Sequence, residues 1–197
     1  MKENILNPEK LKQLSKNIYD IACAHGWHEK PLSQSHWLCL VMTEVAEAVE
    51  ADRNNRHAET DLMADVMKVQ AEGEYGLSEQ WYETWFGIYY REYIKGSIDE
   101  EFADIVIRLL DTANEIHGKD MKWWDSDIHI PYYCRTFSER AWHFVKDVLN
   151  CGTFNISDSI AYMYQWAKQE DIDLDKHIEW KMKYNELRPY KHGGKKY

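Results

Sequence analysis

Hydrophobic residues recur every three or four positions along most of this chain, which is the spacing of one face of an α-helix. Several of these patterns begin with residues that favour a helix N-terminus. Ser97 and Glu100 match a capping box. Asn7 and Pro8 fit an N-cap and a first helical position, and Ser35 can cap another helix. The pattern predicts helices over residues 8–25, 36–52, 62–70, 78–94, 97–116, 138–149, 157–169 and 173–188.

No segment shows convincing alternation of apolar and polar residues bounded by turn dipeptides, which is the pattern typical of β-strands. We therefore predict an all-α fold built as a helical bundle. A chain of 197 residues with 44% hydrophobic content can bury one good core, so we expect residues 1–197 to form a single domain.

The composition excludes several classes of partner. A formal net charge of −10 argues against a nucleic-acid polymer, because such binding depends on clustered Lys and Arg that release counterions. No run approaches the roughly 18 apolar residues of a membrane span. The N-terminus lacks a signal pattern, and the cysteines show no CxxC spacing, so we expect a reduced, cytoplasmic protein. The four cysteines are Cys23, Cys39, Cys134 and Cys151.

Three glutamates, Glu44, Glu47 and Glu50, recur at steps of three in the second predicted helix, which is otherwise apolar. The apolar stripe of that helix consists of Leu38, Val41, Val45 and Ala48. At helical spacing, Glu44 falls within this stripe and Glu47 lies at its edge. Burying an ionised carboxylate is unfavourable unless it is paired or bound to a metal ion. The pattern therefore indicates a partner for these carboxylates.

A second pair of carboxylates lies on the predicted helix 97–116, where Glu101 and Asp104 are again three residues apart. Residues at this spacing are neighbours on a helix, so two helices can together present Glu44, Glu47 and this second pair to one ion. Carboxylate oxygens suit Mg²⁺, and also Mn²⁺. The sequence thus predicts a Mg²⁺ site of four carboxylates, in which one of the two glutamates on the first helix could also act as a general base.

A plainer interpretation is open for each pair, because charged residues usually form a solvated helix face. Arg108 lies four residues after Asp104, so these two side chains could simply form a surface ion pair.

The C-terminal region favours a site over a solvated face. The predicted helix 173–188 begins with apolar residues and continues on the same helical line as Lys181, Asn185 and Arg188. Residues 181–197 hold six Lys or Arg against one acidic residue, within an acidic chain. A lysine and an arginine aimed at carboxylate-bound metal would suit a polyphosphate bridged between the two.

Three stretches together resemble the motifs of the MazG-like nucleotide pyrophosphohydrolases, a family of the all-α NTP pyrophosphatase superfamily. They are "GWHEKPLSQSHWLCLVMTEVAEAVEADR", "DEEFADIVIRLLD" and "KMKYNELRPYKHGGKKY". The family pattern of ExxE followed by ExxD matches the four carboxylates Glu44, Glu47, Glu101 and Asp104. The resemblance covers about residues 8–53 and 97–118 and the C-terminal 25 or so.

This resemblance implies Mg²⁺-dependent hydrolysis of a nucleoside triphosphate, ribo or deoxyribo, between its α and β phosphates. The products are a monophosphate and pyrophosphate. It also implies a homodimer or a higher homo-oligomer, with phosphates bound at Lys181, Asn185 and Arg188. The chain departs from the family pattern by two longer segments, about 54–96 and 119–170, which we interpret as helical insertions.

The base of a nucleotide needs a flat apolar partner, and nine tryptophans offer many candidates. Trp27 and His36 lie nearest to the first carboxylate pair in sequence, so we expect these two to contact the base. Three other classes of protein stay open. The first is a di-iron bundle, although neither acidic pair of this sequence has the Glu-x-x-His that such a bundle requires. The others are a regulatory protein that binds nucleotides without hydrolysis and an interaction protein whose aromatic segment 78–95 packs against a partner.

Overall fold

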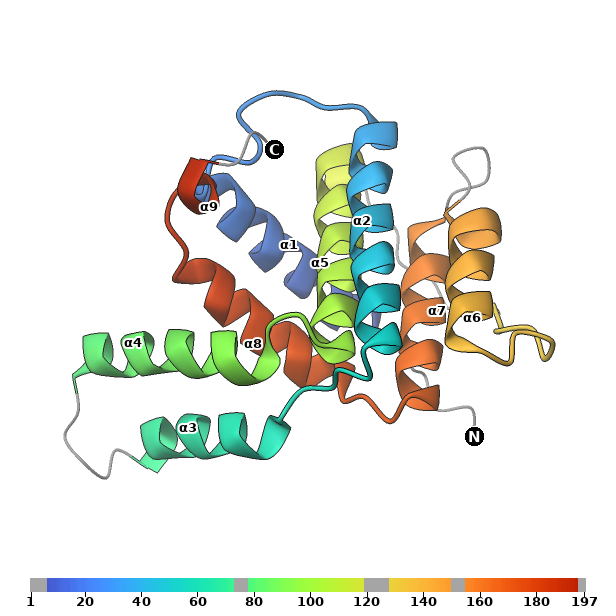
Figure 1. Cartoon of the computed structure of the whole chain (residues 1–197). Helices are drawn as coiled ribbons and strands as arrows, with labels where there is room; N and C mark the ends of the chain where they lie inside the picture. The colour runs from blue at the N-terminus through green and yellow to red at the C-terminus, as the bar shows by residue number, and fades with distance from the viewer. Residues whose placement is uncertain (1–6, 73–77, 119–127, 150–154, 195–197) are drawn as a thin grey trace.

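The computed structural model describes residues 7–72, 78–118, 128–149 and 155–194, and within these residues the chain is helical with no β-strand. The prediction of an all-α fold is confirmed. Figure 1 shows a bundle of helices from which one helical pair projects to the side. The helices are α1 (Pro8–Ala24), α2 (Gln34–Arg53), α3 (Thr60–Glu72), α4 (Glu79–Tyr89), α5 (Ile98–His117), α6 (Phe137–His143), α7 (Ile156–Gln169), α8 (Leu174–Glu186) and the short α9 (Lys191–Gly194).

Two helices are prolonged by a π-helical turn, η1 (Tyr90–Ile94) after α4 and η3 (Phe144–Val148) after α6. The last element, α9, is irregular, because His192 and Gly193 have positive φ angles within it. Cys151, Gly73, Gly76 and the final lysines lie outside the described residues. Among the helices that the structure describes, none combines the length and apolar character needed to cross a membrane.

Local capping explains where most of the helices begin. The Asn7 side chain accepts hydrogen bonds from the first turn of α1, and Pro8 follows it as the sequence predicts. The prediction that Ser35 caps α2 is wrong. Ser33 has the extended backbone of an N-cap and accepts from the His36 amide, so the helix begins at Gln34.

The capping box predicted for α5 is only half formed. The Ser97 side chain accepts from the Glu100 amide at 3.1 Å. The Glu100 carboxylate, however, accepts from the Gly96 amide rather than from Ser97. Gly96 has a φ of 75°, a conformation that favours glycine, and this turn directs the Gly96 amide toward the carboxylate.

Helix α5 is the centre of the bundle, and it packs against α1, α2, α7 and α8. Residues of α5 that are fully buried include Phe102, Ile105, Leu109 and Leu110. Because α5 is surrounded by other helices, its acidic residues must be paired or must face a cavity. The segment 119–170, in its described part, contributes α6, η3 and α7 to this main core.

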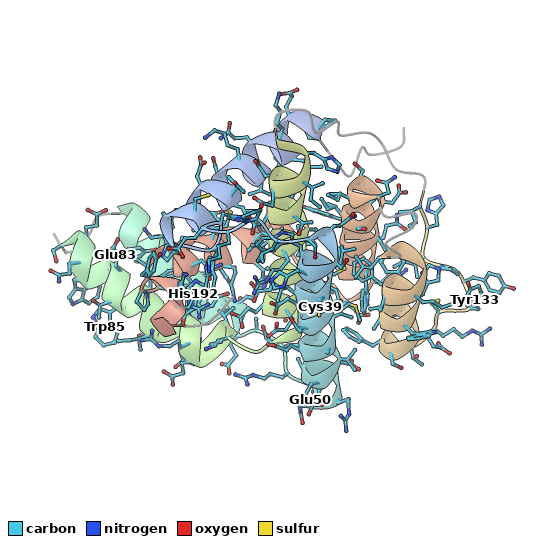
Figure 2. The ribbon with its side chains drawn as sticks, turned by 90° about the horizontal axis from the view of Figure 1, so that it is seen from above. Cys39, Glu50, Glu83, Trp85, Tyr133 and His192 are labelled. Carbon is cyan, nitrogen blue, oxygen red and sulfur yellow. The ribbon has the colours of Figure 1, made fainter. Side chains whose placement is uncertain are left out.

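The segment 54–96 forms a helical arm, α3 with α4 and η1, that rests on α8 (Figure 1). The arm has its own apolar cluster, in which Tyr82, Phe86 and Tyr90 are buried with Trp180 and Tyr184 of α8. Trp81, Trp85 and Ile88 recur at helical spacing along α4, a pattern that predicts a buried face. Trp81 and Trp85 are instead 42% and 38% exposed. In Figure 2, Trp85 on the arm and Tyr133 before α6 lie at opposite ends of the molecule.

Candidate metal and phosphate site

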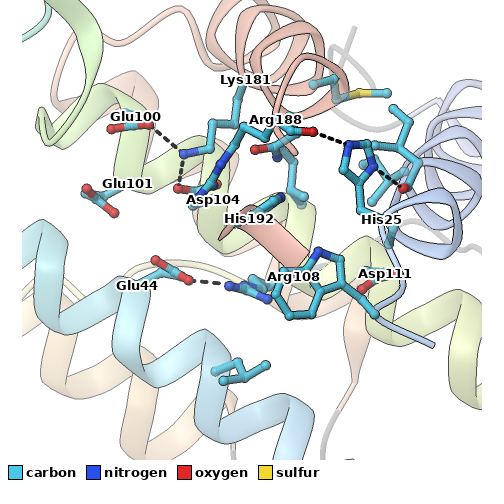
Figure 3. Close-up of a pocket in the computed structure, with 18 of the residues that line it drawn as sticks. His25, Glu44, Glu100, Glu101, Asp104, Arg108, Asp111, Lys181, Arg188 and His192 are labelled. Atoms are coloured by element: carbon cyan, nitrogen blue, oxygen red, sulfur yellow. Dashed lines mark hydrogen bonds and ion pairs between the residues drawn. The ribbon is translucent and has the colours of Figure 1, made fainter. Parts of the chain in front are cut away.

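Three of the four predicted carboxylates meet because α2 and α5 pack side by side (Figure 1). Glu44, Glu101 and Asp104 each offer a carboxylate oxygen, and these oxygens all lie within 4.8 Å of one another. Figure 3 shows the three side chains converging from the two helices. Glu47 lies one turn further along α2, is exposed, and faces the same cavity without belonging to this close group.

The carboxylates of this cluster are held in an unfavourable environment for negative charge. Burial, and then the neighbouring charges of Asp104, Glu100 and Glu47, raise the pKa of Glu101 to about 9. Burial also raises the pKa of Asp104 to about 6, although the Lys181 ammonium works in the opposite direction. Glu101 is 4% exposed, and its Oε2 atom has no hydrogen-bond partner among the described residues.

Two cations reach the cluster from the protein itself. Lys181 Nζ lies 2.5 Å from Asp104 Oδ2 and 2.5 Å from Glu100 Oε1. Arg108 Nε donates to Glu44 Oε1 at 3.1 Å. The surface ion pair considered between Arg108 and Asp104 is therefore not the observed one. Arg108 pairs instead with Glu44 on the facing helix α2, and Lys181 of α8 pairs with Asp104.

Glu100 belongs to the site, although the sequence indicated only a helix cap for it. Its carboxylate is 2% exposed and accepts from the Lys181 ammonium, from the Tyr90 hydroxyl at 3.2 Å and from the Gly96 amide. The signal in the sequence was that Glu100 is a further acidic residue next to Glu101. This signal was ambiguous, because acidic residues are also common in the first turn of a helix.

One cavity of about 260 Å³ connects these groups with the C-terminal helix. All four predicted metal ligands line it, as do Lys181, Asn185 and Arg188, the residues predicted to bind phosphate. Asn185 Oδ1 is buried and has no hydrogen-bond partner among the described residues. The helical line along α8 thus brings a cation, an amide and a guanidinium into the same space as the carboxylates.

Hydrogen bonds and an ion pair hold the C-terminal segment against the loop after α1, and this contact closes one side of the cavity. His25 Nε2 lies 2.9 Å from the Arg188 carbonyl oxygen, and the Lys191 amide donates to the His25 carbonyl at 3.0 Å. Lys191 also pairs with Glu29 at 2.5 Å. Gly26 has a φ of 80°, and a side chain there would overlap the ring of Tyr190.

The two residues proposed for base contact are placed differently by the structure. Trp27 lines the cavity and meets His192 edge to face, with ring centroids 5.0 Å apart. His36 is not among the residues that line the cavity, and its ring contacts Trp37 instead. Trp37 is buried and does line the cavity. Proximity in sequence was therefore a poor guide here, because successive residues of a helix are rotated by about 100°, which turns His36 away from the cavity that its neighbour Trp37 lines.

The residues present fit a hard divalent cation. All the clustered donors are carboxylate oxygens, which are the ligands that Mg²⁺ and Mn²⁺ prefer. The unpaired oxygen of Glu101, buried among further negative charge, is a position that a cation would satisfy.

A second acidic cluster lies further along α5. His28 Nε2 is 2.9 Å from Asp111 Oδ1, and His28 Nδ1 is 3.1 Å from Glu115 Oε2. The His28 side chain is 4% exposed, and Tyr19 stacks against it and also donates to Glu115. Burial alone would lower the pKa of His28, but the hydrogen bond and charge of Asp111, followed by those of Glu115, raise it. Both carboxylates of this cluster therefore lie within ion-pair distance of the same imidazole.

We compared the chain with protein-family models, with curated proteins and with solved structures, and none of the three comparisons found a match. The functional conclusion therefore depends on the residues of the site.

Proposed function

We propose that this protein is a Mg²⁺-dependent nucleoside triphosphate pyrophosphohydrolase, which cleaves its substrate to a monophosphate and pyrophosphate. One observation carries the proposal. A single cavity joins a carboxylate cluster, with its unpaired Glu101 oxygen, to Lys181, Asn185 and Arg188 on the C-terminal side. A polyphosphate chain requires both bound metal ions and cationic side chains around it, and this cavity offers residues for both.

The residues divide into two roles. Glu44, Glu47, Glu101 and Asp104 would hold Mg²⁺, or Mn²⁺ in its place, and the ion would neutralise phosphate oxygens and stabilise charge on the leaving pyrophosphate. Arg188 and Lys181 would hold the phosphates as they separate, and Asn185 would donate to one of their oxygens. The exposed Glu47 is well placed to accept a proton from an attacking water, because it faces the cavity.

Trp27 and Trp37 are the aromatic residues that line the cavity, so we propose them as the flat partners of the nucleotide base. This assignment replaces His36, which faces elsewhere. Membership of the MazG-like family is part of the same proposal, supported by the all-α fold and the convergence of its matched residues.

The proposal extends to the setting of the protein. Cys23 and Cys39 are free cysteines, which supports a reducing, cytoplasmic compartment. The exposed Trp81 and Trp85 on the arm support a homodimer or a higher homo-oligomer.

The test is release of pyrophosphate from a panel of ribo- and deoxyribonucleoside triphosphates with Mg²⁺. We expect turnover by the native protein and its loss in Glu47→Gln and Asp104→Asn. The matched control is Glu50→Gln, because Glu50 follows in the same i+3 series on α2 but does not line the cavity and pairs with Arg53. Glu50 is labelled in Figure 2.

The other outcomes separate the alternatives. A nucleotide-binding regulator would show no turnover, while nucleotides with Mg²⁺ would raise the melting temperature. An interaction protein would respond to neither. Equal loss of turnover in Glu50→Gln would contradict the assignment of the carboxylates.

A further inference from the structure

Two of the three clustered carboxylates already hold a cation that belongs to the chain. Arg108 contacts Glu44 across the interface between α5 and α2, and Lys181 contacts Asp104 (Figure 3). The third carboxylate, Glu101, has an oxygen with no partner in the described part of the chain. An incoming divalent ion therefore finds one carboxylate that holds no cation and two that already hold one.

Lys181 and Arg108 differ in the anionic partners that remain to them when their carboxylate binds another ligand instead. Lys181 is 6% exposed and also donates to the buried Glu100, so it retains an anionic partner and stays at the cluster. The Arg108 side chain is 37% exposed, and Glu44 is its ion-pair partner among the described residues. A partly exposed arginine can turn toward water or toward a ligand without leaving a buried charge unpaired.

We propose that Arg108 is a counter-cation built into the site and that a divalent ion binds by taking Glu44 from it. The inference rests on the proposed function, in which these carboxylates bind Mg²⁺. Release of Arg108 leaves its guanidinium beside the same cavity, where it becomes available to an anionic phosphate group. Binding of the divalent ion thus prepares the anion site, and the two ligands are expected to bind in that order.

The chain offers a matched control for this exchange. Arg188 lines the same cavity as Arg108, but no carboxylate of the described residues lies within ion-pair distance of it, and its guanidinium lies over the ring of Tyr184. Arg108→Met and Arg188→Met each remove one positive charge from the cavity. A general electrostatic effect on cation binding is therefore similar in both, whereas release of Glu44 occurs only in Arg108→Met.

The experiment is calorimetric titration of the metal-free protein with Mn²⁺ alone, without nucleotide. We expect Arg108→Met to bind Mn²⁺ about fivefold more tightly than the native protein, which corresponds to the loss of one partly exposed ion pair. We expect Arg188→Met to change the affinity by less than about twofold. An equal change in both variants overturns the exchange.

A second measurement does not require a variant to bind metal. In the ¹⁵N spectrum of arginine side chains, the Nε–Hε resonance that Arg108→Lys removes identifies Arg108 in the native protein. Exchange requires this resonance to move when Mg²⁺ is added, and a resonance that stays in place overturns the inference.

The two proposals fail in distinguishable ways. If Mn²⁺ binds to none of the three proteins, the metal site of the proposed function fails, and the exchange fails with it. If Mn²⁺ binds to the native protein and both variants respond alike, the exchange alone fails and the proposed function stands.

Discussion

Helix α5 carries two clusters of buried acidic residues that differ in how their charge is balanced. Toward its N-terminus, Glu101 and Asp104 join Glu44, and one oxygen of Glu101 has no partner among the described residues. Toward its C-terminus, Asp111 and Glu115 hold His28 between them. The environment raises the pKa of a carboxylate in the first cluster and the pKa of an imidazole in the second.

On the proposed function, this difference separates a metal-binding site from a structural cluster. In the second cluster each carboxylate has a partner, and removing one partner of a buried ion pair is destabilising. In the first cluster, a buried carboxylate oxygen without a partner costs stability in the absence of a ligand, and such a cost is a common property of sites that bind ions.

The largest effect is expected from Glu101→Gln. We expect hydrolysis of nucleoside triphosphates to fall by at least about a hundredfold, because a ligand to the ion is lost. We also expect the metal-free variant to be more stable than the native protein at pH 7, by on the order of 3 kcal/mol. The reason is that a carboxylate with a pKa of about 9 must take up a proton on folding.

Pyrophosphate release and urea unfolding in EDTA measure these two changes. Glu50→Gln is the control, since Glu50 lies outside the cavity and is expected to change neither quantity. A metal-free Glu101→Gln variant that is less stable than the native protein would show that Glu101 is a structural residue.

The next effect is expected from His28→Gln in the second cluster. Removing the imidazole takes away the ion-pair partner that Asp111 and Glu115 share, so we expect the free energy of unfolding to fall by about 3 kcal/mol. Urea unfolding measures this change. Mn²⁺ affinity at a temperature where the variant is folded is expected to stay within about twofold of the native value. Loss of Mn²⁺ binding in this variant would instead indicate that the two clusters form one site.

The dependence of stability on pH is expected to be the third effect. Because the pKa of Glu101 is raised on folding, its contribution to stability falls as pH rises from about 4.5 to about 9. The stability difference between Glu101→Gln and the native protein should therefore grow with pH, by at most about 1.4 kcal/mol per pH unit.

The pKa of His28 is also raised on folding, so its stabilisation is complete below pH 6.5 and is lost as pH rises through its folded value. The two contributions have the same sign, but only that of Glu101 should be reduced by saturating Mg²⁺. Unfolding curves at several pH values, with and without Mg²⁺, separate them. If the unfolding free energy depends on pH in the same way with and without Mg²⁺, the contrast between the two clusters is contradicted.

The smallest effect is expected from Glu115→Gln. Asp111 remains as the partner of His28 in this variant, and the Glu115 side chain is more exposed than that of Asp111. We expect a loss of about 1 kcal/mol in unfolding free energy, with hydrolysis unchanged. Thermal and urea unfolding measure it, and a loss as large as that of His28→Gln would mean that the cluster acts as one unit.

Much of the fold follows from local signals in the sequence. The cap at Asn7 and the apolar repeat of α5 predict their helices correctly, because capping and helical periodicity depend on residues within one or two turns. The helical arm shows the limit of such signals. Aromatic residues occur around α4 on more than one face, so spacing alone could not decide that Tyr82 and Phe86 are buried while Trp81 is exposed.

Periodicity in the sequence predicts that the chain is helical, that Glu44 lies on a buried face and that α8 carries Lys181, Asn185 and Arg188 on one line. These properties depend on positions along a single helix. Which charges meet depends instead on how the helices pack against one another. Arg108 turns to Glu44 rather than to a neighbour four residues away, because the contact crosses between helices that are far apart in sequence and its partner is set by how they pack.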